Sequence, residues 1–184
     1  PPRLRRQRQM CIRDRIFSKK KNLRVLSLKQ YSPPGFSIKT IGGGSLGQEH
    51  DDSKLFKKHL SIPTKKKLTQ NQTSTGLFAW KVVKHTKSNA IVVAKNNKII
   101  SISGGQTSRV DATKIAFEKT KVPRGCVVAS DAFFPFKDSI ETMAKYEIAA
   151  IIQPGGSIRD SEVVESCNKN RIAMAYTGFR VFKH

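Results

Sequence analysis

The pattern of hydrophobic and polar residues predicts alternating strands and helices from residue 74 to the end of the chain. Short apolar runs bounded by polar residues are typical of buried strands, and such runs occupy residues 90–94, 99–102, 126–129, 149–152 and 172–176. Apolar residues at helical spacing predict helices over residues 75–84, over residues 110–119, around residues 140–148 and around residues 163–167. Asn96 and Asn97 lie between the first two strands and predict a hairpin turn. The alternation predicts an α/β domain.

The stretch on which this region centres is residues 130–138. A polar pair and three aromatic residues follow a predicted strand there and precede a predicted helix. In α/β proteins, ligands usually bind at the carboxyl ends of the strands. A similar arrangement recurs at residues 153–157, which follow the next predicted strand. We therefore expect two neighbouring strand ends to form the floor of a ligand pocket.

Two features of these strand ends have both a structural and a functional interpretation. Phe133, Phe134 and Phe136 belong to the core, or at least one of them faces a planar ligand. Ser157 and Asp160 fit a capping box for the last helix. The alternative interpretation places Ser157 against a ligand.

A glycine-rich loop at residues 103–109 leads into the helix predicted over residues 110–119. The amide groups and the dipole at a helix N-terminus favour an anion. Arg109 adds a planar fork of donors that suits a phosphate or a carboxylate. We therefore expect an anionic group to bind beside Arg109.

Residues 16–73 are interpreted as a partial upstream segment and a basic linker. Residues 23–28 and 36–41 are predicted strands. The glycine-rich residues 42–48 lack the Gly-Lys-Ser/Thr ending of a P-loop, so a flexible turn or a close backbone approach is favoured. Residues 50–73 are polar and rich in lysine, and they predict a surface connection with solvated lysines.

Chain length and net charge limit the classes of protein to which the chain can belong. The chain has 184 residues, enough for one domain or one and a half, and a formal net charge of +22. Such a charge favours polyanions or small anionic substrates as binding partners.

No apolar run reaches the ~18 residues of a membrane span, and no secretory signal pattern is present, so we expect a cytoplasmic protein. Cys11, Cys126 and Cys167 lack Cys-x-x-Cys spacing and predict buried, reduced thiols, with a catalytic or metal-binding cysteine as the less favoured alternative.

Residues 1–15 show neither apolar periodicity nor turn residues. A basic arm for nucleic acid is one interpretation. Residues 5–15 also match, at every position, one reading frame of a common transposon-derived sequencing adapter. We therefore predict that residues 1–15 are not native, that a true N-terminal part is missing, and that the remaining chain carries +17 of the +22 charges.

Several catalytic signatures are absent from the sequence. His50, His59, His85 and His184 show no metal-pair spacing, and each is interpreted as a surface or packing residue. There is no His-x-Glu with Pro-Cys-x-x-Cys, the signature of zinc deaminases. There is also no Gly-x-Ser-x-Gly, His-Glu-x-x-His or Walker motif. We therefore expect no bound metal.

Several longer motifs together resemble one protein family. They are LFAWKVVK at residues 77–84 with KSNA at 87–90, GQTSRV at 105–110, SDAFFPF at 130–136, IQPGGSIRD at 152–160 and FKH at 182–184. With these motifs, the chain from about residue 16 to residue 184 resembles the C-terminal part of the bifunctional purine biosynthesis protein family. The matching part is its phosphoribosylaminoimidazolecarboxamide (AICAR) formyltransferase region.

The resemblance implies a three-layer α/β/α fold like that of cytidine deaminases, without zinc, with residues 74–184 as the C-terminal subdomain. It implies transfer of a formyl group from 10-formyltetrahydrofolate to the 5-amino group of AICAR in purine biosynthesis. The parent protein also carries inosine monophosphate (IMP) cyclohydrolase. The family is expected to work in the cytosol as a homodimer with the active site at the subunit interface.

The resemblance also assigns roles to individual residues. Asn89 would support catalysis by holding the carboxamide or formyl group, and Arg109, Phe133 and Arg180 would bind AICAR. The residues expected to face the folate are Val110, Phe136, Asp138, Ser157 and Ile158.

One departure from the family pattern concerns the general base. The family supplies a histidine from a Lys-His-x-Asn-Pro motif. Lys58-His59 and Lys84-His85 match two letters of it but lack the Asn-Pro, so the role is given to neither. Because the aminoimidazole amine is a weak nucleophile and needs a base, we expect this chain to bind ligand poorly and not to turn over alone.

Two other interpretations remain. The charge alone would fit a basic nucleic-acid-binding module, but the lysines are spread over linkers and no RNA-recognition or helix-turn-helix signature is present. Nucleic acid is therefore the less favoured partner. The third interpretation is an inactive dimerisation remnant of the parent enzyme.

Overall fold

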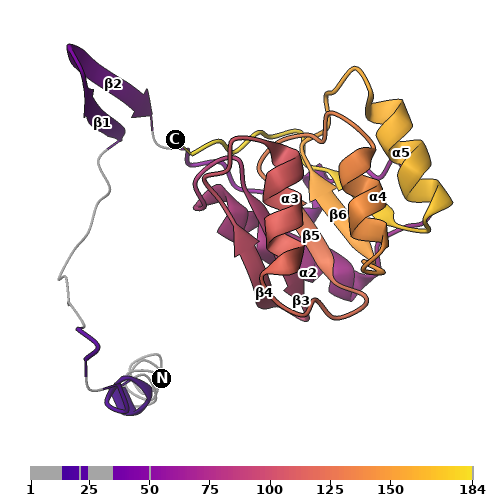
Figure 1. Ribbon diagram of the computed structural model, residues 1–184, viewed down its shortest axis with the longest axis horizontal. Coiled ribbons are helices and arrows are strands. Elements are labelled where there is room, and N and C mark those ends of the chain that lie inside the picture. Colours follow the sequence, from indigo (N-terminus) through magenta and orange to yellow (C-terminus); the bar gives the residue numbers. More distant parts are fainter. Residues whose placement is uncertain (1–13, 21, 25–34, 50, 184) are drawn as a thin grey trace. The chain divides into compact units, whose positions relative to one another are not determined.

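The structure is a computed structural model that describes residues 14–20, 22–24, 35–49 and 51–183. The chain divides into two units, residues 1–50 and residues 51–184, and each is described by itself (Figure 1). Most of the predicted strand at residues 23–28 lies outside the described residues.

The first unit contains a short helical turn at residues 14–17 and a β-hairpin. Strand β1 (Phe36–Ile41), predicted from the sequence, pairs antiparallel with β2 (Gly44–Glu49). The predicted turn at residues 42–48 is confirmed only for Gly42 and Gly43, because residues 44–48 belong to β2. A close approach does occur at Gly47, where a Cβ atom would lie 2.4 Å from the ring of Phe36.

The second unit is built on a five-stranded mixed sheet. Its strands are β3 (Ile91–Lys95), β4 (Lys98–Ser103), β5 (Val127–Ser130), β6 (Ala150–Gln153) and β7 (Ala173–Tyr176). Their order is β4-β3-β5-β6-β7. Strands β5, β6 and β7 are parallel, and β3 runs antiparallel to both β4 and β5. The five strands predicted after residue 74 are therefore confirmed.

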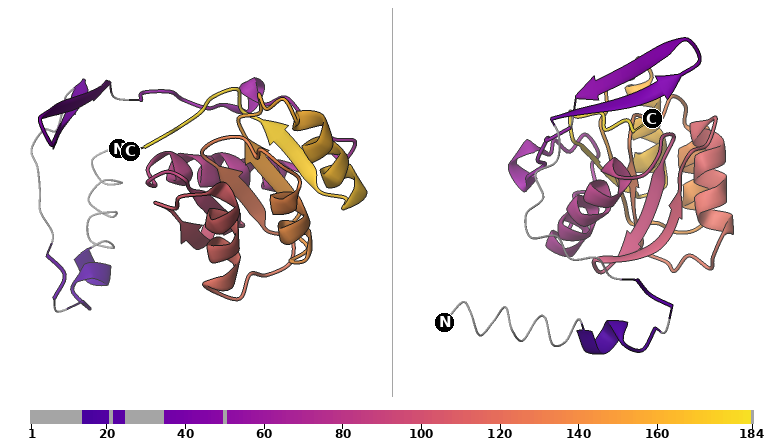
Figure 2. Two further views of the ribbon diagram at one scale, coloured as in Figure 1. Left: turned by 45° about the horizontal axis from the view of Figure 1, so that its top comes forward. Right: turned by 90° about the vertical axis from the view of Figure 1, so that its left-hand side faces the viewer.

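Helices cover both faces of this sheet. They are α2 (Gln70–Lys84), α3 (Arg109–Glu118), α4 (Asp138–Ala144) and α5 (Asp160–Lys169). Helix α2 lies on one face, and α3, α4 and α5 lie on the other (Figure 2). The second unit is thus an α/β domain of three layers.

The two faces of the sheet explain why its strands are apolar without interruption. Ile91, Val93, Val128, Ile151 and Met174 are buried among residues of α3, α4 and α5. Their neighbours Val92, Ala94, Ala129, Ile152 and Ala175 are buried with Ala79, Trp80 and Val83 of α2. Strands that are buried on both faces read as continuous apolar runs rather than as alternating ones.

Helix α2 begins at Gln70, five residues before the start predicted from the sequence. Thr69 caps it: its side chain accepts a hydrogen bond from the backbone N–H of Gln72 at 3.2 Å, and Gln72 Oε1 accepts one from the backbone N–H of Thr69 at 2.9 Å. This reciprocal capping box stabilises a first turn that contains no apolar residue. The apolar period alone therefore placed the start too late.

The basic segment before α2 was predicted to be a surface connection with solvated lysines, and this is correct in part. Residues 65–67 are exposed. Leu55 and Thr64, however, are buried, and Thr64 Oγ1 accepts a hydrogen bond from the backbone N–H of Met174 at 2.9 Å. Ser61 also forms a β-bridge with Tyr176. The segment therefore packs along β7.

No helix in the described part of the chain is long and apolar enough to cross a membrane.

Candidate active site

The loops that carry most of the expected site residues meet at one edge of the sheet. The parallel strands β5, β6 and β7 end there, as the sequence analysis predicted for β5 and β6. Ile91 at the start of β3 pairs with Ser130 at the end of β5 and with Ser103 at the end of β4. The start of β3 and the end of β4 therefore lie at the same edge. The C-terminal segment, yellow in Figure 1, crosses it: Val181 donates to the backbone oxygen of Asp131 and Lys183 accepts from Ser88.

Arg109 lies at this edge as the first residue of α3, and it is only 8% exposed. Its Nη1 donates to Ser130 Oγ at 2.8 Å and forms a close ion pair with Asp131. Its Nη2 donates to Asn89 Oδ1 at 2.8 Å. The structure thus brings together two residues expected at the site, Asn89 and Arg109.

Asn89 joins the glycine-rich loop to the start of β3. Its Nδ2 donates to the backbone oxygens of Gln106 and Thr107 at 3.0 and 3.2 Å. Its Oδ1 accepts from Arg109. Both ends of the amide are therefore used, and this fixes its orientation relative to the guanidinium.

The N-terminus of α3 is capped within the chain. The Ser108 side chain accepts from the backbone N–H of Asp111 at 3.1 Å and donates to the carboxylate of Asp111 at 2.6 Å. An acidic residue in the first turn balances the positive end of the helix dipole. The expected anion at this loop stays a prediction.

Ser130 and Asp131 are neighbours of Arg109 that the sequence analysis placed at the expected strand end but gave no individual role. Both are fully buried, and Ser130 Oγ donates to the backbone oxygen of Ala132 at 2.6 Å. Asp131 Oδ2 is buried without a hydrogen-bond partner among the described residues. The signal was present in the sequence: two polar residues directly follow an apolar strand.

The three aromatic residues after β5 have different environments. Phe134 is fully buried in the core. Phe133 is half-buried, and the guanidinium of Arg180 lies 5.0 Å from the centre of its ring. Phe136 is 47% exposed, with the guanidinium of Arg159 4.9 Å from its ring centre. The core interpretation is therefore confirmed for Phe134, and a planar ligand against Phe133 or Phe136 stays a prediction.

Gln153, another buried polar residue at a strand end, fixes the aromatic loop. Its Oε1 accepts from the backbone N–H of Phe134 at 2.8 Å, and its Nε2 donates to the sulfur of Met174 at 3.2 Å. It is fully buried. The end of β6 thus positions the loop that follows β5.

The predicted capping box of α5 was wrong. The N-cap of α5 is Arg159, and its side chain makes no capping hydrogen bond. Ser157 Oγ accepts from the backbone N–H of Arg159 at 3.2 Å, whereas Asp160 turns back and accepts from the backbone N–H of Gly156 at 2.7 Å. The two side chains therefore shape the loop after β6. Ile158 at its tip is fully exposed.

The ring of Tyr176 packs against the backbone of this loop at Gly155. A Cβ atom on Gly155 would lie 2.9 Å from its ring, and Gly155 has a φ of +75°. Burial raises the pKa of Tyr176, and the nearby carboxylate of Asp160 raises it further. The phenol therefore stays protonated at neutral pH, and its oxygen is buried without a hydrogen-bond partner among the described side chains.

Two other residues expected to face the folate lie at helix starts. Asp138 is exposed in the first turn of α4, where its Oδ1 accepts from the backbone N–H of Ser139 at 2.7 Å. Val110 is half-buried in the first turn of α3. Helices α3 and α4 pack against each other on one face of the sheet.

His59 lies close to the same edge. Its ring packs edge-on against Phe56 and Phe179, with ring centres 5.6 and 6.1 Å away. Its Nδ1 accepts from the backbone N–H of Phe56 at 3.3 Å. The structure thus places His59 beside the loop that carries Phe179.

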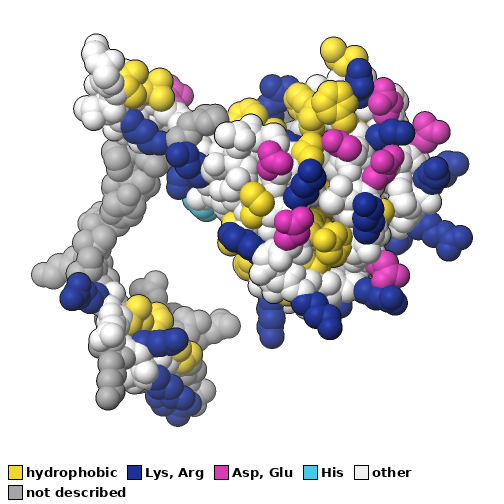
Figure 3. All heavy atoms as spheres, viewed as in Figure 1, with side chains coloured by type: hydrophobic (Ala, Val, Ile, Leu, Met, Phe, Trp, Pro, Cys, Tyr) yellow, Lys and Arg dark blue, Asp and Glu magenta, His cyan; other side chains and the backbone are white. Residues whose placement is uncertain are grey.

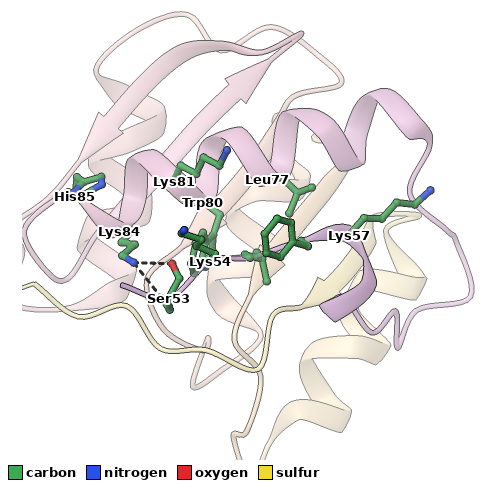
Figure 4. Close-up of a pocket in the computed structure, with 10 residues that line it drawn as sticks. Ser53, Lys54, Lys57, Leu77, Trp80, Lys81, Lys84 and His85 are labelled. Carbon is green, nitrogen blue, oxygen red and sulfur yellow. Dashed lines mark hydrogen bonds between the residues drawn. The ribbon is translucent and has the colours of Figure 1, made fainter. Parts of the chain in front are cut away.

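A pocket of about 500 Å³ lies elsewhere, between residues 53–57 and α2. Figure 4 shows Leu77 and Trp80 in its wall with several lysines around them. Lys84 donates to the backbone oxygen of Ser53 at 2.8 Å and pairs with Asp51 at 3.1 Å. None of the residues expected to bind substrate or folate lines this pocket.

The described residues contain no group of three or more His, Cys, Asp or Glu side chains that could hold a metal ion.

Comparison with known proteins decides the family. Residues 13–119, more than half of the chain, match the family described as AICARFT/IMPCHase bienzyme. The chain belongs to the AICARFT/IMPCHase bienzyme family. The resemblance seen in the sequence is thereby confirmed. The match to the AICARFT/IMPCHase model includes Asn89 and Arg109 and ends before Ser130.

Individual members of this family are similar over most of the chain. The bifunctional purine biosynthesis protein PurH of Aquifex aeolicus is 51% identical over 174 residues, which cover 92% of this chain and 34% of that protein. PurH of Persephonella marina is 47% identical over 177 residues, covering 93% and 34%, and PurH of Acetivibrio thermocellus is 49% identical over 178 residues, covering 92% and 34%. The chain spans about one third of the length of these relatives.

Proposed function

We propose that residues 51–184 form one part of an AICAR formyltransferase site in purine biosynthesis. The observation that carries this proposal is the convergence of Asn89, Arg109, Phe133 and Arg180 at one edge of the sheet. Membership of a purine biosynthesis family gives the class of reaction. The site residues suggest the formyltransferase half rather than the cyclohydrolase half.

AICAR would bind where an aromatic face and two cations lie together. Phe133 offers a half-buried ring to the aminoimidazole, and Arg180 is an exposed cation for the phosphate. Asn89 and Arg109 would hold the carboxamide or the formyl group. The co-substrate, 10-formyltetrahydrofolate, would lie against Phe136, Ser157 and Ile158, because Phe136 and Ile158 expose apolar surface for it.

In the proposed reaction, the 5-amino nitrogen of AICAR attacks the formyl carbon. A C–N bond forms to the ribotide, the formyl C–N bond of the folate breaks, and the amine proton passes to the folate nitrogen. The chain lacks the Lys-His-x-Asn-Pro motif for the base. We therefore expect weak binding and no turnover by this chain alone. The finer fold expectation, a cytidine deaminase-like domain without zinc in a cytosolic homodimer, belongs to the same proposal.

The distribution of charge agrees better with small anionic substrates than with nucleic acid. On the face of the α/β unit drawn in Figure 3, lysines and arginines are interspersed with aspartates and glutamates. A continuous basic stripe would be the expected footprint of a nucleic-acid site.

Calorimetric titration of AICAR into the 184-residue chain tests the proposal. We expect saturable binding that Arg180→Ala weakens about tenfold, because a charge-assisted hydrogen bond of about 1.5 kcal/mol is lost. Arg124→Ala is the matched control, since Arg124 is exposed in the loop that precedes β5. Absence of AICAR binding, with steeply salt-dependent binding of duplex DNA instead, would refute the proposal.

A further inference from the structure

Arg109 and Asp131 are the only charged residues that are buried in the described part of the chain. Removing a charge from water costs free energy that a pair recovers only with good geometry and further hydrogen bonds. Here the pair lies at the proposed site and has two additional partners, Ser130 and Asn89. Stability alone therefore does not explain a buried ion pair at this place.

The contacts of Arg109 leave part of its guanidinium unused. An arginine has five N–H donors. Both donors of Nη1 are taken by Ser130 and Asp131, and one donor of Nη2 is taken by Asn89. The Nε donor and the second Nη2 donor have no protein partner among the described residues. These two donors are available to a ligand that reaches the 8% of Arg109 that is exposed.

We propose that Asp131 is a positioning and specificity residue that acts through Arg109, an inference that rests on the proposed function. Its carboxylate holds one side of the guanidinium and leaves the Nε and Nη2 donors for the ribotide. It also cancels the formal charge of Arg109. A free anion such as inorganic phosphate therefore gains little at Arg109, because a neutral pair attracts it far less than an isolated cation would. The ribotide still gains directed hydrogen bonds.

Asp131→Asn removes the charge of residue 131 and nearly keeps the shape of its side chain. An asparagine oxygen can still accept from Nη1, and the amide is nearly isosteric with the carboxylate. The variant leaves Arg109 as an uncompensated cation. We expect AICAR to bind at least tenfold more weakly because a neutral amide holds the guanidinium less firmly than the ion pair does. We expect inorganic phosphate to bind at least threefold more tightly, which a merely structural role of Asp131 would not produce.

The matched control is Glu118→Gln, which removes the same charge from an exposed residue of α3. It should leave the binding of both AICAR and phosphate unchanged. Asp131→Glu restores the negative charge but moves the carboxylate by one methylene. It should return phosphate binding to the level of the natural chain.

A measurement without ligand or substitution tests the positioning directly. The ¹⁵N-resolved Nη1–H signals of Arg109, which are bonded to Ser130 and Asp131, should exchange with water at least tenfold more slowly than the Nη–H signals of the exposed Arg171. Equal exchange rates in the natural chain would overturn the proposal, even if Asp131→Asn failed to fold. A folded Asp131→Asn variant with unchanged phosphate affinity would overturn it as well. Failure of the natural chain to bind AICAR would count against the proposed function, whereas the exchange and phosphate measurements would still decide the role of Asp131.

Discussion

At the scale of single residues, Gly76 sets the distance between α2 and the sheet. A Cβ atom there would lie 2.1 Å from Cδ1 of Ile152 and 2.9 Å from its Cγ1. Ile152 is fully buried and belongs to the core cluster that packs against α2.

We therefore expect Gly76→Ala to lower the free energy of unfolding by roughly 1–3 kcal/mol through overpacking. The direction of the change in unfolding free energy separates overpacking from helix propensity, because glycine to alanine in an unconstrained helix stabilises by up to about 1 kcal/mol. Urea denaturation measures the effect. Lys81→Ala, an exposed change on the same helix, should stay within ~0.5 kcal/mol. A raised midpoint for Gly76→Ala would show that α2 is not held this closely.

Cys167 is a second residue with a clear expected behaviour. Burial raises the pKa of its thiol to about 12. Because the thiolate is the reactive form, we expect no alkylation of Cys167 by iodoacetamide at pH 8 in the folded chain, and rapid alkylation in urea. Peptide mapping by mass spectrometry measures both. Since the folded pKa lies above the unfolded value of about 8.5, this thiol also favours unfolding as the pH rises between those values. Fast labelling of the folded chain would contradict its burial.

The sequence predicted some site residues and missed others for a physical reason. Asn89 and Arg109 stand in recognisable motifs, and the structure brings them together. Asp131 and Gln153 make their contacts with residues about twenty positions away, in α3 and in the loop after β5. Such pairing depends on strand order, which the hydrophobic pattern does not contain.

At the scale of elements, the capping box at Thr69 defines the start of α2. Replacing a capping threonine by alanine typically costs about 1 kcal/mol. We expect Thr69→Ala to lower the free energy of unfolding by that amount. Thr69→Ser keeps the hydroxyl and should keep most of the stability. Thermal unfolding followed by circular dichroism compares them, and equal losses for both variants would mean that the hydroxyl does not cap the helix.

Elements were predicted well where burial on both faces makes them apolar, as in β5 and β6. They were predicted poorly where hydrogen bonds rather than apolar contacts define them. The first turn of α2 is polar and depends on Thr69 and Gln72. Strand β2 is rich in glycine and exists by pairing with β1. At α5, Asp160 bonds to Gly156 instead of serving a capping box.

At the scale of the whole α/β unit, strand direction brings the site residues to one edge of the sheet. The parallel strands alone would bring together the loops after β5, β6 and β7. The antiparallel placement of β3 between β4 and β5 adds Asn89 and the glycine-rich loop. The sequence predicted adjacency of β3 and β4, through the hairpin turn, and of β5 and β6, but it did not predict the pairing of β3 with β5, because that contact is long-range.

The measurement that tests the central claim most directly is a titration of the ¹⁵N-labelled chain with AICAR, followed by NMR. We predict that amide signals shift at residues 88–90, 104–109, 131–136 and 177–181, all at the proposed edge. Signals of Asn96 and Asn97, in the turn at the opposite ends of β3 and β4, should stay unchanged. Ribose 5-phosphate, which lacks the base, should shift fewer signals in the aromatic loop. Shifts confined to the pocket around Trp80, or none at all, would contradict the assignment of the site to this edge.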